Sequence, residues 1–294
     1  MRSVVVTGVS SGLGSATAKL LVERGFRVFG SVRRTADADE ARGLLGAAFT
    51  PLMFDVTDEA AVRAAAEIVR AELGGETLAG LVNNAGMAVP GAVLELSADD
   101  FRRQLEVNLI GPVVVTQAFA PLLGTDRGLT GPMGRIVMIS SLSGVRGDPF
   151  MGAYVASKHA LEGLSETLRR ELMLFGIDVV LIGPGPIKTP IWAKAEAADI
   201  AANEASPYHA ALVRAREMSR ELEAIGLAPE KVATLVHEAL TARRPKARYA
   251  IVPDPVKTWF SANLPKRLVD RITARMVGIV PLKRGGEHSP AAEP

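Results

Sequence analysis

The feature that most constrains the fold is a strand, a glycine-rich turn and a helix in direct succession at the start of the chain. Residues 3–7 form a β-branched run that ends at Gly8, a pattern typical of a fully buried strand. The turn reads Thr7-Gly-Val-Ser-Ser-Gly-Leu-Gly14, and apolar residues at helical spacing follow it until Gly25. Glycines let the backbone approach a pyrophosphate, and a helix N-terminus offers free N–H groups. This succession predicts the opening unit of a dinucleotide-binding fold, with GxxxGxG spacing in place of GxGxxG.

Short apolar runs alternate with helical patterns along most of the chain. We expect further strands at residues 26–32, 50–54, 78–82, 135–139, 177–182 and 248–252. Alternation without a shift in composition predicts a single-domain α/β Rossmann fold: a doubly wound, mainly parallel seven-stranded sheet with helices on both faces. The domain should span residues 1–282. Within it we expect a helical substrate lid at about 190–228 and a C-terminal extension at about 253–282, followed by a disordered tail at 283–294.

Composition narrows the possible functions. The charges nearly cancel, with 34 Lys and Arg against 32 Asp and Glu, so no basic field for nucleic acid is expected. The chain has no cysteine, which excludes disulfides, and its four histidines show no metal-binding spacing. No apolar run reaches the ~18 residues of a spanning helix, and the first strand begins too near Met1 for a signal peptide. We therefore expect a cytoplasmic protein without a metal site.

The end of the second predicted strand indicates the type of dinucleotide. At this position an acidic side chain binds the free ribose hydroxyls of NAD, whereas arginine pairs with the 2′-phosphate of NADP. Val32 stands where the acidic residue is expected, and Arg33 and Arg34 follow it. The pair predicts NADP(H) over NAD(H), although a solvated loop would also account for two arginines. The turn adds no basic residue, because Ser11 precedes its second glycine.

Tyr154 and Lys158 lie four residues apart in a helical pattern, and therefore on one face of the helix. A phenol with an ordinary pKa near ~10 is a weak acid at neutral pH, and a neighbouring ammonium would lower that pKa. In isolation, the pair is more often a packed tyrosine and a surface lysine. Asn108 is a helix-disfavoured residue inside a predicted helix, which indicates a local kink near Gly111-Pro112 or a functional role.

Taken together, the motifs resemble the short-chain dehydrogenase/reductase family over roughly residues 3–190. They occur in the family's order: the glycine turn, Asn83-Asn-Ala-Gly86, Asn108, Ser141, Tyr154-x3-Lys158 and Pro184-Gly-x3-Thr189. The resemblance implies that Asn108, Ser141, Tyr154 and Lys158 form a catalytic tetrad. Tyr154 would exchange a proton with the carbonyl oxygen, and Ser141 would hydrogen-bond that oxygen. Lys158 would hold the nicotinamide ribose and lower the pKa of Tyr154, and Asn108 would kink its helix and hold a water.

The same resemblance implies the cofactor contacts. The pyrophosphate side would be formed by Gly8, Ser10, Gly12, Leu13 and Gly14, and the 2′-phosphate side by Arg33 and Arg34. The adenine and its ribose would be flanked by Asp55, Val56, Asn84, Ala85 and Gly86. The nicotinamide end would meet Tyr154, Lys158, Pro184, Gly185, Ile187 and Thr189. Hydride transfer is the reaction that these contacts would serve.

The last part of the chain indicates the substrate. Through Leu168-Arg-Arg-Glu-Leu172 and its long extension, the chain resembles the retinol and 17-beta-hydroxysteroid dehydrogenase branch. The lid carries apolar residues that agree with that resemblance: Ile191, Trp192, Ala193 and Ile200. We expect interconversion of an alcohol and a ketone or aldehyde on a bulky lipophilic substrate of steroid or retinoid type. Two alternatives stay open: a 3-oxoacyl thioester reductase, and a protein that senses NADP without turnover.

An apolar stripe marks the C-terminal extension, with arginines and lysines between its members: Trp259, Phe260, Leu264, Leu268, Ile272 and Met276. Such a stripe would suit a membrane surface, but packing into the core or a subunit contact is favoured. By family resemblance, the long helices near 100–123 and 152–175 should form a homodimer or homotetramer.

Overall fold

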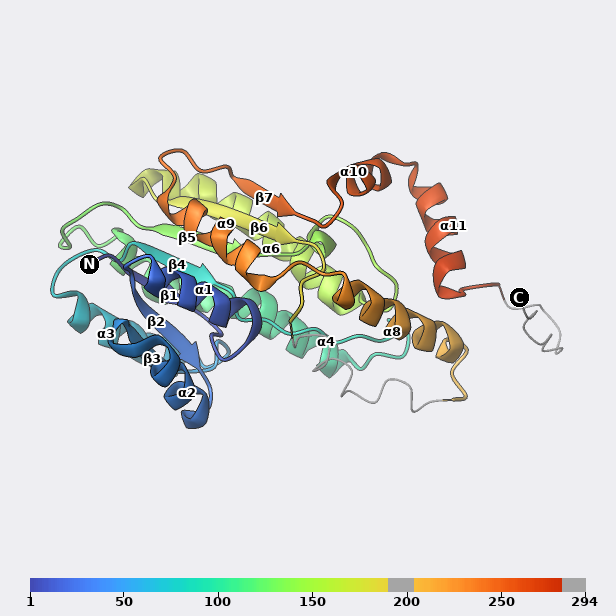
Figure 1. The fold of residues 1–294 in the computed structure, drawn as a ribbon, viewed down its shortest axis with the longest axis horizontal. Coiled ribbons are helices and arrows are strands. Elements are labelled where there is room, and N and C mark those ends of the chain that lie inside the picture. The colour runs from blue at the N-terminus through green and yellow to red at the C-terminus, as the bar shows by residue number, and fades with distance from the viewer. Residues whose placement is uncertain (190–203, 282–294) are drawn as a thin grey trace.

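A seven-stranded parallel sheet with helices on both faces forms the body of the molecule (Figure 1). The computed structural model describes residues 1–189 and 204–281. Every pairing between neighbouring strands is parallel, which confirms the predicted Rossmann sheet. The strands are β1 (Ser3–Val6), β2 (Arg27–Val32), β3 (Phe49–Met53), β4 (Gly80–Asn83), β5 (Arg135–Ile139), β6 (Asp178–Pro184) and β7 (Arg248–Ile251).

The strand order locates the ligand-binding edge of the sheet. The order is β3-β2-β1-β4-β5-β6-β7, so the winding of the chain reverses between β1 and β4. In open α/β sheets, ligands bind outside the carboxyl ends of the strands at such a reversal. The glycine-rich turn follows β1 and the Asn83–Gly86 segment follows β4, so both of these predicted cofactor segments flank the reversal.

Helices cover both faces of the sheet. One face carries α1 (Gly12–Glu23), α2 (Thr35–Leu45) and α9 (Pro229–Thr241). The opposite face carries α3 (Glu59–Leu73), α5 (Gly111–Phe119) and α6 (Gly152–Glu171). The other α-helices in the described ranges are α4 (Ala98–Leu105), α8 (His209–Ala224), α10 (Pro255–Asn263) and α11 (Lys266–Val277).

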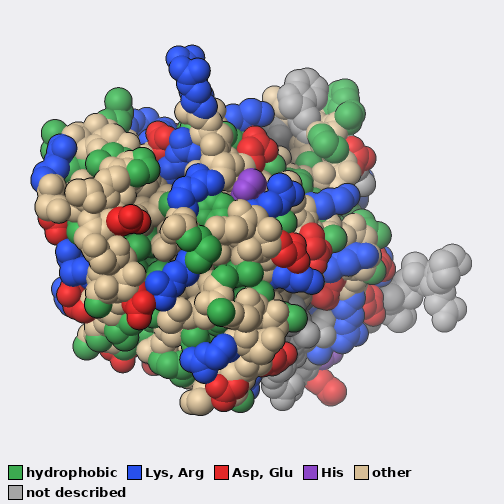
Figure 2. Space-filling model, turned by 60° about the vertical axis from the view of Figure 1, so that its left-hand side comes forward, with side chains coloured by type: hydrophobic (Ala, Val, Ile, Leu, Met, Phe, Trp, Pro, Cys, Tyr) green, Lys and Arg blue, Asp and Glu red, His purple; other side chains and the backbone are tan. Residues whose placement is uncertain are grey.

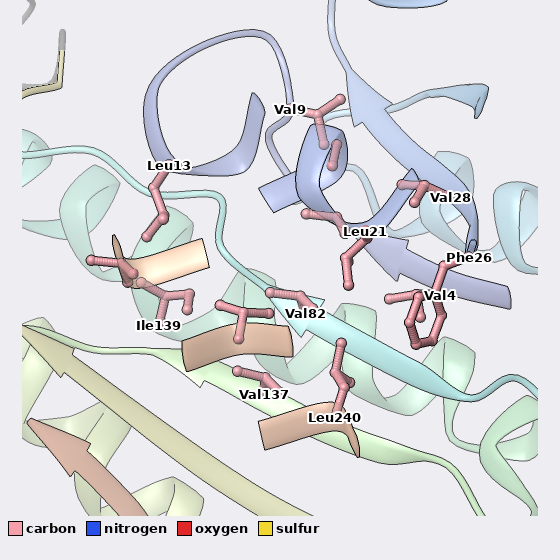
Figure 3. Packing of buried hydrophobic residues seen from close by; sticks show 14 of the residues in the cluster. Val4, Val9, Leu13, Leu21, Phe26, Val28, Val82, Val137, Ile139 and Leu240 are labelled. Carbon is pink, nitrogen blue, oxygen red and sulfur yellow. The ribbon is translucent and has the colours of Figure 1, made fainter. Parts of the chain in front are cut away.

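Each face of the sheet has its own apolar core. Alternate residues of β1 divide between the two cores: Val4 and Val6 lie in one and Val5 in the other. A strand buried on both faces explains the unbroken β-branched run that opens the chain. Figure 3 shows the first core, in which Leu21 of α1 and Leu240 of α9 lie among the valines of the strands.

Residues 204–281 include a looser part of the molecule beside the sheet. The predicted helical character of the 190–228 segment is confirmed for α8, whereas its action as a lid stays a prediction. A small cluster joins α8 and the end of α11 to the loops after β4 and β5, and its buried members are Ala92, Phe150, Ala211, Leu212 and Val277. Outside the described residues lie the predicted lid positions Ile191, Trp192, Ala193 and Ile200, and the tail from residue 283.

The apolar stripe of the C-terminal extension faces outward. Leu268 is 42% exposed, Met276 is 53% exposed and Phe260 is 60% exposed. Of the two favoured outcomes, packing into the core does not apply to these three side chains, because α11 turns Val277 inward and Leu268 and Met276 outward; a subunit contact stays a prediction.

The surface carries charges of both signs. On the face shown in Figure 2, Lys and Arg side chains lie interspersed with Asp and Glu, as the formal net charge of +2 suggests. Within the two described ranges, no helix combines the length and apolar character that crossing a membrane requires.

Candidate active site

The turn after β1 forms a tight cradle against the segment after β4. Gly8 has a φ of 72° and Gly12 a φ of 60°, both in the left-handed region that favours glycine. A Cβ atom on Gly14 would overlap the carbonyl oxygen of Gly8. The Asn84 amide nitrogen donates to the Thr7 carbonyl at 2.8 Å, and the Asn84 backbone N–H donates to the Thr7 hydroxyl at 2.9 Å. The result is a fixed backbone cradle at the N-terminus of α1, which fits a pyrophosphate.

A hollow of about 410 Å³ lies beside this cradle, lined by Ser10, Arg33, Arg34 and Asp37. Arg33 pairs with Asp55 at 3.2 Å, and Arg34 pairs with Asp37. The side chains of the two arginines are 73% and 76% exposed. The two carboxylates are less exposed, Asp55 at 34% and Asp37 at 12%, so each arginine is paired on one side and turns most of its surface to solvent. The hollow therefore fits the 2′-phosphate of NADP, and Asp37 is the member that the sequence did not indicate.

The predicted adenine-side residues play different structural roles. Burial opposes ionisation of Asp55, but hydrogen bonds from Thr57 and then Arg33 outweigh it and lower the pKa of the Asp55 carboxyl. Val56 is buried, and a Cβ atom on Gly111 of α5 would meet its side chain, so Val56 packs within the core. Leu13 is likewise a core residue, in the cluster shown in Figure 3.

The segment after β4 supports the turn. The backbone N–H of Ala85 donates to the Thr7 hydroxyl at 2.9 Å. A Cβ atom on Gly8 would lie 3.0 Å from the Cα of Ala85, so the two segments are in direct contact. Since the Asn84 amide nitrogen is also bonded to the turn, this side chain acts within the protein; contact of Asn84, Ala85 and Gly86 with a ribose stays a prediction.

Tyr154 lies in the first turn of α6 and is 9% exposed. Burial raises the pKa of the Tyr154 phenol, the Ser141 hydroxyl beside it acts in the opposite direction, and the Asp148 carboxylate raises it further. The Lys158 ammonium lies 5.8 Å from the centre of the phenol ring. The sequence led us to expect a pKa lowered by Lys158, but in the structure the largest cause of the shift is the loss of water around the phenol, which raises the pKa.

Lys158 is almost fully buried beneath the end of β5. Its Nζ donates to the Ile139 carbonyl at 2.9 Å. Burial lowers the pKa of Lys158 to about 8, and the Glu162 carboxylate opposes that change. An ammonium with a pKa so near neutrality is suited to passing on a proton.

Ser141 lies two residues after β5 and caps the start of a short turn, Leu142–Gly144. Its hydroxyl accepts a hydrogen bond from the Ser143 backbone at 3.1 Å, and the Ser143 hydroxyl donates to Asp148 at 2.8 Å. Ser141 is partly exposed, whereas the neighbouring Ser140 is buried. The loop therefore brings Ser141 and the Asp148 carboxylate to the same side as Tyr154.

Asn108 lies in a π-helical turn, Glu106–Ile110, between α4 and α5. The predicted irregularity of this helix is thus confirmed, and it is centred on Asn108 itself. The side chain is buried and connects two segments: its oxygen accepts from the Met87 backbone at 2.9 Å, and its nitrogen donates to the Met87 carbonyl at 3.0 Å and to Ser157 at 3.2 Å. Because Ser157 lies in α6, Asn108 ties the π turn to the helix of Tyr154.

The predicted nicotinamide-side residues follow β6. Pro184 ends that strand, and the Gly185 N–H donates to the Ile251 carbonyl of β7 at 2.8 Å. Ile187 is buried and pairs with the segment that precedes α9. Thr189 is partly exposed and adjoins the residues that the structure does not describe.

Besides Asp37, three further features of the site were not predicted. Asp148 follows no motif. Phe150 has a φ of 62° and, among the described residues, is the only one other than glycine with a positive φ. Glu162 accepts three hydrogen bonds from Arg248, at 3.0, 3.1 and 3.3 Å. Only Glu162 had a usable signal in the sequence, since it lies one helical turn after Lys158.

Comparison with known proteins agrees with this geometry. A family model for short chain dehydrogenases matches residues 2–200. An NADPH-dependent 3-dehydrocapnine reductase of Ornithobacterium rhinotracheale is 41% identical over 275 residues, covering 92% of this chain and 96% of its own. Human retinol dehydrogenase 5 is 35% identical over 286 residues, covering 92% and 86%. A solved short chain dehydrogenase/reductase from Burkholderia phymatum, in complex with NAD, has a TM-score of 0.76 at 29% identity, covering 92% of this chain and 95% of its own. The chain therefore belongs to the short-chain dehydrogenase/reductase family of oxidoreductases and resembles its retinol dehydrogenase-like branch.

Proposed function

We propose that this oxidoreductase interconverts an alcohol and a ketone or aldehyde on a lipophilic substrate, with NADP(H) as its cofactor. The observation that carries the proposal is the grouping of Ser141, Tyr154 and Lys158 where β5 ends and α6 begins. The Tyr154 ring and the Lys158 ammonium are 5.8 Å apart, and the Ser141 hydroxyl acts directly on the pKa of the phenol.

Tyr154 is the proposed general acid in reduction and general base in oxidation. A buried phenol with a raised pKa keeps its proton at neutral pH, which an acid must do before it protonates a carbonyl oxygen. Ser141 would donate a hydrogen bond to that oxygen as negative charge develops on it. Lys158, with a pKa of about 8, would hold a ribose hydroxyl and return a proton to Tyr154.

Asn108 is the proposed link from Lys158 to solvent. A π turn displaces the regular helical hydrogen bonds, so a backbone carbonyl can be left for another donor, and such turns are frequent at functional sites. The Asn108 side chain is occupied by Met87 and Ser157, so its backbone is the part that would hold a water.

The glycine turn would hold the cofactor's pyrophosphate, and Arg33 and Arg34 its 2′-phosphate. When bound, the cofactor supplies or accepts the hydride. Two observations support NADP(H): the arginine-lined hollow beside the turn, and the printed name of the relative at 41% identity, which is NADPH-dependent.

A lipophilic substrate is supported by the apolar cluster beside the site. Phe150 lies four residues before Tyr154 and packs with Leu212 of α8 and with Ala92. The names of two relatives, a retinol dehydrogenase and a 3-dehydrocapnine reductase, agree with an alcohol and its oxidised counterpart as the reacting pair.

The test compares Tyr154→Phe with Tyr249→Phe, a matched loss of a phenol oxygen from a tyrosine of β7. NADPH consumption would be followed on retinoid and steroid carbonyls and on a 3-oxoacyl thioester. Removal of the acid should lower kcat/KM by about 10²–10⁴-fold, whereas Tyr249→Phe should retain most of the activity. Equal rates for the wild type and Tyr154→Phe would refute the catalytic assignment, and activity confined to the thioester would refute the substrate class.

The cofactor assignment has its own test. The double variant Arg33→Ala/Arg34→Ala should weaken NADPH binding by about tenfold or more, since hydrogen bonds to a charged group contribute ~1.5–3 kcal/mol each. NADH binding should change little. Arg42→Ala serves as the control, because Arg42 lies in α2 and, like Arg34, pairs with an aspartate three residues away. An equal loss for both cofactors would contradict the 2′-phosphate assignment.

A further inference from the structure

The outer face of the C-terminal extension carries a continuous row of apolar side chains. On α11 they recur every four residues, and Leu268, Ile272 and Met276 are 42%, 43% and 53% exposed. We call this row the apolar ridge; it consists of Leu264, Leu268, Ile272, Met276, Ile279 and Val280. Single exposed apolar residues are ordinary on a protein, but a row of them marks an interaction site.

A basic stripe runs beside the apolar ridge. Arg267, Arg271 and Arg275 repeat at the same interval one residue earlier, about 100° around the helix, and all three are exposed. Lys266 opens the helix, and Asp270 is its single acidic residue. No ion pair joins these basic side chains to any residue in the described ranges. The helix therefore presents four basic groups against one carboxylate.

The packing of α11 fixes which face is outside. Val277 is buried in the cluster that contains Ala211 and Leu212 of α8, while Thr273 and Ala274 are half-buried. Rotation of the helix to bury the apolar ridge would expose Val277 and open that cluster. In Figure 1, α10 and α11 lie beyond the body of the molecule, on the side to which the arrowheads of β6 and β7 point.

We infer that α11 docks the protein on an anionic lipid surface, with the apolar ridge in the acyl boundary and the basic stripe at the headgroups. Amphipathic helices with an apolar row and flanking arginines bind in this way without spanning the bilayer. A second copy of the chain is the competing occupant. Two α11 helices laid together would bring their basic stripes into proximity, whereas anionic headgroups complement them.

Flotation of the full-length protein with lipid vesicles tests this inference without any measurement of activity. We expect binding to vesicles that contain phosphatidylglycerol, at least tenfold weaker binding to pure phosphatidylcholine, and weaker binding as salt is raised. The triple variants Leu268→Ser/Ile272→Ser/Met276→Ser and Arg267→Gln/Arg271→Gln/Arg275→Gln should each reduce binding at least tenfold.

The matched control is Leu44→Ser/Ile68→Ser/Leu174→Ser, which changes three more exposed apolar residues elsewhere, at 62%, 52% and 77% exposure. It should bind vesicles as the wild type does. Thermal unfolding checks that each variant is folded. If the serine variant does not fold, the arginine variant alone provides the test. Wild-type protein that fails to float with anionic vesicles overturns the inference, as does binding that neither variant reduces. Loss of a dimer in the serine variant, without vesicle binding by the wild type, assigns the ridge to a second copy.

Discussion

Two regions of the molecule differ in how much apolar surface they bury: the sheet with its covering helices, and the outer helices α8, α10 and α11. In the sheet, strands such as β1 are buried on both faces, and each face has a large apolar core. Of the outer helices, α8 and α11 contribute to one small cluster with five buried members, two of which come from the loops after β4 and β5. Segments with few buried contacts open at low free-energy cost, whereas the core opens only with global unfolding. We therefore expect the candidate active-site residues of the sheet region to be held rigidly, and the outer helices to open more easily.

Polar side chains in the two regions differ in burial as well. In the sheet region, Lys158 and Asn108 are buried and each is hydrogen-bonded to the backbone of another segment. On α8, Arg214 and Glu217 form an ion pair at 3.4 Å in which both side chains are 54% exposed. A polar group that has lost water needs its partner, whereas an exposed group can exchange its partner for water. Single substitutions should therefore have large effects in the first region and small effects in the second.

The largest expected difference concerns two leucines on helices. Leu21 of α1 is fully buried, whereas Leu268 of α11 is 42% exposed. Leu21→Ala should lower the free energy of unfolding by about 2–5 kcal/mol, because it leaves a cavity. Leu268→Ala should change it by about 0.5 kcal/mol. Urea unfolding of the two variants measures both values. Similar losses would show that the outer helices are as tightly built as the sheet.

Lys158 gives a prediction about pH. Its folded-state pKa of about 8 lies below its ordinary 10.5, so the unfolded chain binds the proton more tightly. The free energy of unfolding should therefore rise with pH from about 8 towards 10.5, by up to ~3 kcal/mol for a shift of this size. Tyr154 works against this above its ordinary pKa of 10.0, because its folded-state pKa is raised.

Comparison of the wild type with Lys158→Met isolates that contribution. The wild type should gain stability relative to the variant as pH rises from about 8 to about 10, measured by urea unfolding at several pH values. Lys266→Met on α11 is the control, because it makes the same substitution at an exposed lysine. A constant difference for Lys158→Met would mean that burial does not lower the lysine pKa.

Substitutions at Gly14 and Gly43 test how closely the glycine-rich turn packs against the start of α1. A Cβ atom at Gly14 would overlap Gly8, whereas nothing lies within 4 Å of one at Gly43 in α2. Gly14→Ala should destabilise the protein by about 1–3 kcal/mol and weaken NADPH binding. Gly43→Ala should stabilise it by up to ~1 kcal/mol, because alanine favours a helix. Thermal unfolding and cofactor titration provide the measurements. Equal tolerance at both positions would contradict the close approach of the turn to its own helix.

The sequence predicted the sheet because its signals are local. The β-branched run before Gly8, the glycine turn and the alternation of strand and helix patterns each act over a few residues. The same locality explains the agreement at Asn108, since a helix-disfavoured residue within an apolar helix marks an irregularity wherever the helix lies.

Features that depend on the assembled fold were not predictable in this way. The raised pKa of Tyr154 follows from burial and from Asp148, which a loop brings near it. The positive φ of Phe150 leaves no trace in composition. The stripe on α11 has the period of a core-facing helix, so its outward orientation became known only from the packing of Val277.

The smallest expected difference concerns two glutamates. Glu162 has a 15% exposed side chain and pairs with Arg248 of β7, whereas Glu217 on α8 is 54% exposed. Glu162→Gln should cost about 1–2 kcal/mol, because Arg248 keeps a neutral acceptor but loses a charged one; Glu217→Gln should cost about 0.5 kcal/mol or less. Since Glu162 raises the pKa of Lys158, its neutralisation should also move that pKa below about 8, and the pH dependence of stability should begin at lower pH. A stability loss with no change in the Lys158 pKa would mean that Glu162 only holds β7 against α6. A stability loss together with a lowered Lys158 pKa would connect β7, from which the C-terminal extension starts, to the proposed proton-transfer site.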